Sequence, residues 1–321
     1  MRKPRRLLAI VDLDAEAHPG LEKAGRLAAA LDARLEAYAC EWSAVAPRRG
    51  RGANRARTEA LDAREAALAA LVRAVVPPEV RTTVAVDFEH PRDAAILAYV
   101  RDAAPDLVLL DSHFHPGVRR ALFGPADWPL IRRCPVPLLY AKPRPWGAAP
   151  RVAVAVDPGH PADPDGSLDA ALVAAGVALA GALRGSLCLV HAFLPLAPVF
   201  ALPAIAGAPG LDPSAAQRAA VAAEQAARER VGALLPRRVH VRPEVVLLHG
   251  AAVETLPGFA EVEQLDVLAL GAVARRGARG RLYEAVIGAT AERLLERVDC
   301  DLLVVPTPRD RAQRRVRRRV R

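Results

Sequence analysis

The loop that follows the apolar run DVLAL is rich in glycine and arginine. Its glycines are Gly271, Gly277, Gly280 and Gly288, and its arginines are Arg275, Arg276, Arg279 and Arg281. Glycines where a strand passes into a helix let the backbone come close to a neighbouring group. Guanidinium groups bind phosphate and carboxylate. The residues therefore favour an anionic ligand, although neither GxxxxGK[ST] nor GxGxxG is present. The alternative is a tight strand-loop-helix connection.

A second candidate site lies in DSHFH, directly after another apolar run. Asp111, His113 and His115 alternate there, and alternate residues of an extended segment point the same way, so the three can converge on a metal such as zinc. The simpler interpretation is two loop histidines bonded to water or backbone, because His-x-His is a short and common pattern. HExxH and GxSxG are both absent from the sequence. We therefore expect no metal and no hydrolase.

An internal repeat positions these residues. LLAIVDLD (7–14) resembles VAVAVDPG (152–159), and DLVLLD (106–111) resembles DVLALG (266–271). The alignment closes with LIRRCPVPLLYAK (130–142) against LLERVDCDLLVVP (294–306), without a gap. The chain therefore contains two copies of one domain, which KPRPWGAAPR connects.

Each copy alternates short β-branched or Leu-rich runs with longer Ala-rich helical patterns. The runs predict strands near 6–12, 34–41, 80–88, 106–111 and 136–142, and near 151–157, 185–192, 239–248, 266–271 and 301–306. The patterns predict helices near 17–33, 54–76, 91–104 and 125–134, and near 165–183, 213–235, 251–264 and 288–298. This alternation indicates an α/β fold, with a doubly wound parallel sheet covered by helices on both faces.

The repeat resembles the universal stress protein family. An Asp ends strand one, a Gly ends strand four, and a Gly-rich loop leads into helix four. FGPADWPLIRRCPVPLLYAKPRPW, with GAVARRG and IGATAERLLERVDCDLLVVPTP, is similar to the E-type tandem subgroup in particular. The resemblance implies two Rossmann-like domains, residues 1–145 with a degenerate nucleotide motif and residues 150–308 with a partial one. It also implies that they pack together as an internal pseudo-dimer, and a further homodimer stays open.

Members of the family that this chain resembles share a G-x2-G-x9-G-[S/T] motif when they bind ATP. The resemblance implies an ATP site in the second copy at Ala155, Val156, Asp157, Leu270, Gly271, Ala274, Gly277, Gly288, Ala289 and Thr290. The last glycine opens a helix whose N-terminus holds phosphate without a lysine. The match is partial: Ala274 replaces the second glycine, the loop is about four residues longer, and Ala289 replaces the hydroxyl residue that Thr290 can supply.

The first copy departs further from the pattern. Asp111 stands at the position of Gly271, and a carboxylate in a phosphate site would repel the ligand. We expect this copy to bind no nucleotide and to serve as a scaffold or pseudo-symmetric partner.

Most of the net charge of +9 comes from the C-terminus. Residues 309–321, RDRAQRRVRRRVR, carry +7, so the rest of the chain carries +2. We expect a disordered tail with at most weak attraction to RNA or an anionic surface. Four dispersed cysteines without zinc spacing indicate buried thiols in a reducing, cytoplasmic compartment. Residues 192–211 are uncharged, and their four prolines indicate an apolar loop that covers something apolar.

Three functions compete on these observations. The first is a cytoplasmic stress-response protein that binds ATP or a related nucleotide in its second copy and acts through protein partners of unknown identity. The second is a nucleotide-free adaptor that binds an apolar small ligand or RNA. The third, an enzyme, ranks last because no nucleophile and general base can be paired. At most a weak ATPase is expected.

Overall fold

The computed structural model describes residues 3–41, 53–88, 91–111, 127–161, 163–194, 213–235, 243–272, 294 and 297–308. Its strands are β1 (Arg6–Val11), β2 (Arg34–Glu41), β3 (Thr82–Phe88), β4 (Leu107–Asp111), β5 (Leu138–Ala141), β6 (Arg151–Ala155), β7 (Ser186–Phe193), β8 (Glu244–His249), β9 (Val267–Ala272) and β10 (Asp301–Pro306). Its helices are α1 (Pro19–Leu31), α2 (Ala53–Val75), α3 (Arg92–Ala103), α4 (Asp127–Arg133), α5 (Ser167–Leu183), α7 (Pro213–Ala233) and α8 (Ala252–Val262).

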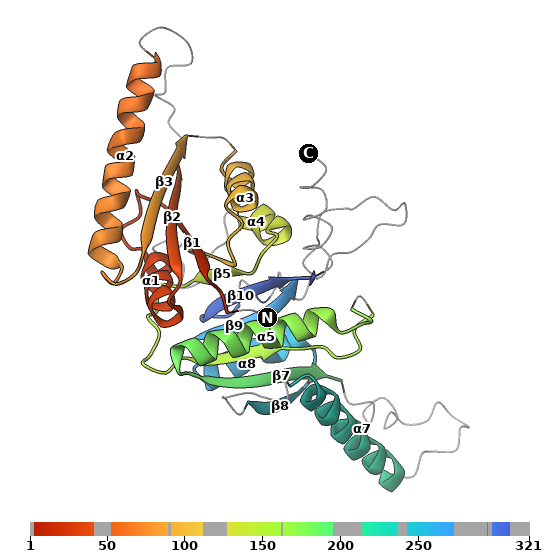
Figure 1. Cartoon of the computed structure of the whole chain (residues 1–321). Coiled ribbons are helices and arrows are strands. Elements are labelled where there is room, and N and C mark those ends of the chain that lie inside the picture. Colours follow the sequence, from red (N-terminus) through yellow and green to blue (C-terminus); the bar gives the residue numbers. More distant parts are fainter. Residues whose placement is uncertain are drawn as a thin grey trace, which may run out of the picture.

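One sheet of ten strands runs through both copies (Figure 1), in the order β3-β2-β1-β4-β5-β10-β9-β6-β7-β8. Within each copy the strands pair in parallel. Between the copies, β5 pairs with β10 in the antiparallel direction. The two predicted parallel sheets are therefore confirmed, and they join edge to edge as the expected pseudo-dimer.

The junction has pseudo-two-fold symmetry. Leu139 pairs with Leu303 at its centre, while Leu302 pairs with Tyr140 on one side and Val304 with Leu138 on the other. Leu138 and Leu302 hold the same register beside their neighbouring strands, because they pair with Val108 and Leu268. The axis therefore passes between Leu139 and Leu303.

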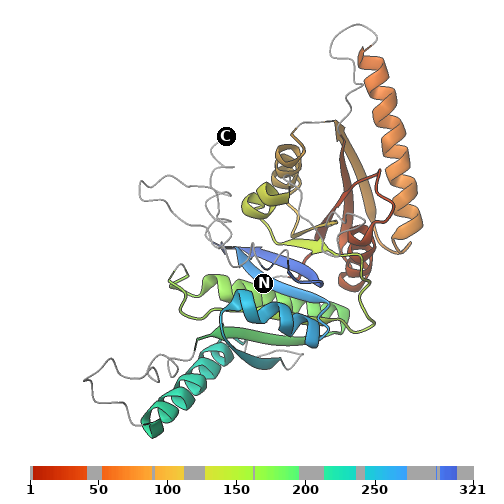
Figure 2. The same ribbon diagram turned by 180° about the vertical axis from the view of Figure 1, so that it is seen from behind.

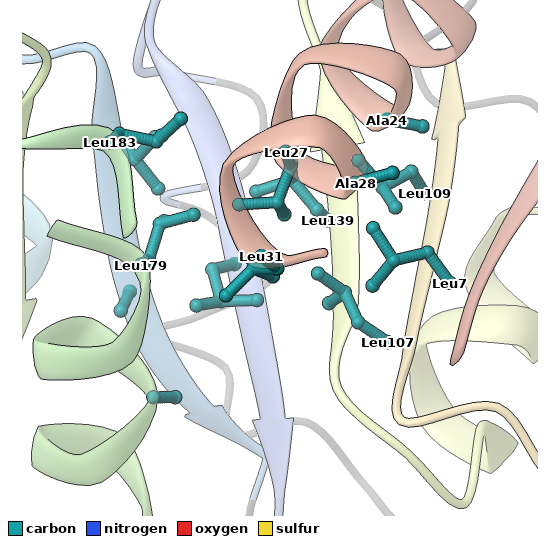
Figure 3. Close-up of a cluster of buried hydrophobic side chains, with 14 of the residues drawn as sticks. Leu7, Ala24, Leu27, Ala28, Leu31, Leu107, Leu109, Leu139, Leu179 and Leu183 are labelled. Atoms are coloured by element: carbon teal, nitrogen blue, oxygen red, sulfur yellow. The ribbon is translucent and has the colours of Figure 1, made fainter. Parts of the chain in front are cut away.

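Helices cover both faces of the sheet. On one face, α1, α2, α5 and α7 contribute to a core that includes Leu27, Leu68, Leu179 and Val231. On the other, α3, α4 and α8 contribute to a core that includes Leu97, Ile131 and Leu256. The view from behind (Figure 2) shows α2 and α7 projecting from opposite ends of the molecule. Figure 3 shows the leucines of α1 and α5 that gather over the middle strands, where the copies meet.

Several sequence expectations can be compared with this fold. β6 ends at Ala155 rather than 157, because a turn begins at Asp157, whose carbonyl accepts a hydrogen bond from the His160 N–H at 3.0 Å. No disulfide joins the four cysteines, all of which the structure describes, and Cys188 is only half-buried where burial was expected. Within the described ranges, none of the helices has the length and hydropathy needed to span a membrane. The Arg-rich tail and nearly all of the apolar segment lie outside the described residues.

Candidate functional site

The candidate residues lie at the carboxyl ends of neighbouring strands. In each copy the strand order reverses between strands one and four, which are β1 and β4 in the first copy and β6 and β9 in the second. Open α/β sheets bind ligands at such a reversal. Ala155 ends β6, with Val156 and Asp157 directly after it, and Leu270 and Gly271 lie in β9. The other predicted residues, Ala274, Gly277, Gly288, Ala289, Thr290, His113 and His115, lie outside the described part of the chain.

Asp157 is the exposed acidic group of the second copy's candidate site. Its side chain is 61% exposed, and its Oδ1 lies 3.9 Å from Nδ1 of the buried His191. That Nδ1 lies 3.0 Å from the Val156 carbonyl oxygen. A carbonyl only accepts, so the imidazole proton sits on Nδ1 and fixes the ring beside Asp157. The Asp157 carboxylate is thereby presented to solvent at the end of β6 and can accept hydrogen bonds from a ligand.

Val156 and Leu270 contribute to this site differently from Asp157. Both side chains are buried. The Val156 N–H donates to the Val190 carbonyl at 3.0 Å, and its carbonyl faces His191. Leu270 pairs with Val304 of β10. The side chains of these two residues therefore belong to the core, and their backbone groups already bond within the protein.

A buried carboxylate caps the N-terminus of helix α5. Asp163 Oδ2 accepts the backbone N–H groups of Leu168 at 2.9 Å and Asp169 at 3.3 Å. The Asp169 carboxylate in turn accepts the Asp157 N–H at 3.1 Å. Burial raises the pKa of Asp169, which the Asp157 N–H partly offsets. The N-terminus of α5 is thus satisfied from its own preceding loop.

Gly271 lies against α5. A Cβ added at this glycine would come within 2.7 Å of Leu168 Cδ2 and 3.3 Å of Leu172 Cδ1. Both leucines are buried. The helix contact therefore accounts for a glycine at this position, and it is compatible with either a ligand or a purely structural turn at the rest of the loop.

In the first copy, Asp111 binds α1 instead of facing open space. Its Oδ1 accepts the Gly20 N–H at 2.5 Å, in the first turn of that helix. Burial raises the pKa of Asp111 to about 6, although the Gly20 N–H and Lys23 act in the opposite direction. Across the described residues, no group of three His, Cys, Asp or Glu side chains is placed to hold a metal. Of the three candidate metal ligands in DSHFH, only Asp111 lies within that part of the chain.

The strand-one aspartates also differ between the copies. Asp12 follows β1 as Asp157 follows β6, and its Oδ2 lies 3.8 Å from the Arg92 guanidinium at the start of α3. Ala252 holds the equivalent first position of α8. The first copy therefore pairs its partly exposed aspartate with an arginine, whereas the second copy has an alanine at that helix position.

Sequence reasoning missed His191, Asp163 and Asp169 at this site. Each is a buried polar residue, and polar residues are rarely buried without a partner. Of the three, His191 carried the only readable signal, since it interrupts the apolar run of β7. The two aspartates lie in a stretch rich in Asp, Pro and Gly, which any surface loop would resemble.

Comparison with known proteins places both copies in one family. The profile described as "Universal stress protein family" matches residues 3–142 and 150–306. "Universal stress protein E" of Escherichia coli (strain K12) is 31% identical over 216 residues, which cover 66% of this chain and 64% of that relative. "Universal stress protein E homolog" of Haemophilus influenzae is 28% identical over 73% of this chain and 72% of its own.

Solved structures resemble the whole chain. A protein of unknown function from Pseudomonas aeruginosa PAO1 matches 97% of this chain and 95% of its own, with a TM-score of 0.68 and 21% identity. A universal stress protein from Archaeoglobus fulgidus DSM 4304 matches 94% and 98%, with a TM-score of 0.63 and 16% identity. At these identities the likeness shows the fold.

Proposed function

Because this chain belongs to the universal stress protein family as a tandem of two copies, we propose that it binds ATP or a related nucleotide in its second copy. The exposed carboxylate of Asp157 carries this proposal, since it lies where the strand order reverses. It would accept a hydrogen bond from an amino group of the base. The phosphates would lie toward Gly288, Ala289 and Thr290 at the expected start of helix four.

The first copy does not bind nucleotide on this proposal. Asp12 is engaged by Arg92, and Asp111 places a carboxylate at the end of β4, where Gly271 stands in the second copy. A negative charge there opposes a phosphate. The protein would act in the cytoplasm by changing its partner surface with nucleotide, with at most slow ATP hydrolysis.

Matched variants of the two copies test the proposal. We expect Asp157→Ala to weaken ATP binding about tenfold, as for one lost hydrogen bond, and Asp12→Ala to leave it unchanged. In the loops, Gly288→Val should abolish binding and Gly124→Val should not. Isothermal titration of the full chain measures all four. Equal losses in both copies, or no affinity in the parent protein, would contradict the proposal.

One observation favours the alternative adaptor function. Leu194, near the start of the uncharged segment 192–211, is 73% exposed, as an apolar docking surface would require. Mass spectrometry of small molecules released from the purified protein separates the two functions. ATP or AMP supports the nucleotide proposal, whereas a lipid supports the adaptor.

A further inference from the structure

A cluster of buried charges lies where the two copies meet. Lys23 of α1, Lys142 after β5 and Asp301 of β10 are only 4%, 4% and 2% exposed. Lys23 Nζ donates to Asp301 Oδ1 at 2.8 Å and to the Lys142 carbonyl at 2.7 Å. Lys23 belongs to the first copy and Asp301 to the second, so their ion pair crosses the junction.

The partners in this cluster are specific. Asp301 also accepts the Lys142 N–H on Oδ1 at 2.7 Å and the Trp146 indole N–H on Oδ2 at 2.8 Å. Lys142 Nζ donates to the Val298 carbonyl at 2.8 Å. Burial raises the pKa of Asp301 and lowers that of Lys142. A charge buried to this degree strongly destabilises a protein when its partner is removed.

The pseudo-two-fold axis relates this cluster to apolar residues. Helices α1 and α5 can be matched at their C-terminal ends, because Asp32 and Arg184 both adopt a left-handed conformation there and each lies two residues before the next strand. Counted back from these ends, Lys23 corresponds to Ala175. Asp301 corresponds to Pro137, one residue before the matched Leu302 and Leu138.

Ala175 and Pro137 both lie on the other side of the axis. They line one apolar cavity of about 30 Å³ together with Leu27, Leu31 and Leu179, and Figure 3 shows these leucines. The place that holds an ion pair on one side of the axis is therefore lined by apolar groups on the other. The junction is symmetric in its backbone and asymmetric in its charges.

This asymmetry decides which pairings are tolerated. Two first copies paired through β5 would each bury Lys23 against the other's Pro137. Two second copies paired through β10 would each bury Asp301 against the other's Ala175. Both arrangements leave Lys23 or Asp301 without its counter-charge, whereas a first copy paired with a second keeps their ion pair.

We propose that the Lys23–Asp301 cluster is a recognition pair through which the first copy accepts only a second copy as its partner at this sheet edge. The rejected partner is an identical copy from another chain. Such repulsion against the wrong partner is a general source of specificity. The inference concerns pairing and does not rest on nucleotide binding.

Two single variants of the full chain test it when they are mixed. Lys23→Met leaves Asp301 unpaired within its own chain, and Asp301→Leu leaves Lys23 unpaired within its own. If the two chains exchange partners, the two substituted apolar side chains meet each other and Lys23 meets Asp301, so neither charge remains unpaired. Exchange between two chains that carry the same substitution leaves their buried charges unpaired.

The free energy gained by restoring the ion pairs is expected to exceed the free energy lost when pairing within one chain is given up. Restoring two broken buried pairs favours the mixed dimer by about 10⁴-fold or more. For a short flexible linker, pairing within one chain has an effective concentration of roughly 1 mM, which favours it about tenfold at about 0.1 mM protein. The connecting segment here also buries Trp146, which raises this preference, and the restored ion pairs have to outweigh both. We therefore expect most chains to form a 1:1 dimer after the variants are unfolded together and refolded. Light scattering gives the mass, and ¹⁵N labelling of one variant shows whether the dimer is mixed.

Two controls complete the design. The double variant Lys23→Met/Asp301→Leu has no charge to pair and should run at the mass of the parent. Arg151 and Glu263 form an ion pair within the second copy, with side chains 49% and 38% exposed. Mixing Arg151→Met with Glu263→Leu should therefore give no mixed dimer.

The outcomes are distinct even where a single variant does not fold alone, because the mixture should then rescue it. Single variants that lose stability but stay at the parent mass in the mixture would show a merely structural ion pair. Single variants as stable as the parent, or a failure of the mixture to rescue unfolded ones, would also overturn the proposal. When Asp301→Asn, which keeps the shape of the side chain, replaces Asp301→Leu in the mixture with Lys23→Met, the fraction of mixed dimer should be smaller.

Discussion

The two copies satisfy the start of their first helix with carboxylates from different places. In the second copy, Asp163 lies five residues before Leu168, whose N–H it accepts. In the first, Asp111 lies at the end of β4, 91 residues from Gly20. The first copy thus uses the end of its fourth strand as a helix cap. The second copy caps itself locally, and its fourth strand carries an uncharged glycine there.

The residues of the first helix that face the end of strand four differ in size in the opposite direction. By the same helix-end register, Gly20 corresponds to Leu172, as Asp111 corresponds to Gly271. The larger residue lies on the strand in the first copy and on the helix in the second. One contact between strand four and helix one is therefore filled in two ways, and a charge is compatible with only one of them.

Gly271→Asp should have the largest effect, because it places a carboxylate against two leucines. The N–H of Leu172 lies inside α5, which begins at Ser167, so it cannot cap the new carboxylate as Gly20 caps Asp111. We expect a loss of about 3 kcal/mol or more in the free energy of unfolding, as for a buried unpaired polar group.

Gly271→Ala is the matched control for size. Its Cβ meets mainly the flexible end of Leu168, so we expect a loss of only about 1 kcal/mol. Urea denaturation compares the two variants. Equal stabilities would mean that solvent reaches the end of β9, and the contrast between the copies would then be wrong.

Local patterns predicted most of the fold. The expected strands 34–41 and 301–306 agree with β2 and β10 at both ends. In β10, DLLVVP, a leucine- and valine-rich run that ends at a proline sets the limits of the strand. The helix expected over 17–33 is shorter, Pro19–Leu31, since Pro19 occupies its first turn and Asp32 adopts a left-handed conformation. The repeat predicted the pseudo-dimer because it supplies both halves.

Contacts distant in sequence could not be predicted in the same way. Asp111 was expected to point toward a phosphate site, and its bond to Gly20 depends on how closely α1 approaches β4. Lys23 and Asp301 are 278 residues apart, and each resembles a surface residue by type. A lysine within an apolar helix face was the available signal, and one sequence does not identify its partner.

Gly20→Ala should show that the first copy's arrangement depends on close approach. A Cβ at Gly20 would lie 3.1 Å from the Leu110 carbonyl carbon and 3.2 Å from the Asp111 nitrogen, and these backbone atoms cannot turn aside. We expect a loss of about 1–2 kcal/mol in the free energy of unfolding, although alanine favours helix.

Gly181→Ala in α5 is the control for helix propensity. A Cβ there meets nothing within 4 Å, so this variant should gain up to about 1 kcal/mol. Thermal denaturation of both variants decides the question. If both gained stability, α1 would have room to move away from β4, and its contact with Asp111 would not require glycine.

Asp111→Asn should have no effect at pH 4 and an effect that grows as the pH rises. The pKa of Asp111 is raised from 3.8 to about 6, so the folded protein holds this proton more tightly than the unfolded chain. The resulting stability is complete below about pH 4 and is lost as pH rises through 6. Asparagine stays neutral and can still accept the Gly20 N–H, so the variant should match the parent near pH 4 and exceed it by about 3 kcal/mol at pH 8. Asp32→Asn, at a side chain 93% exposed, makes the same change in net charge and should give no such trend. A difference between Asp111→Asn and the parent that stayed constant from pH 4 to 8 would mean that Asp111 is not a buried cap, and the contrast with Gly271 would then be one of size alone.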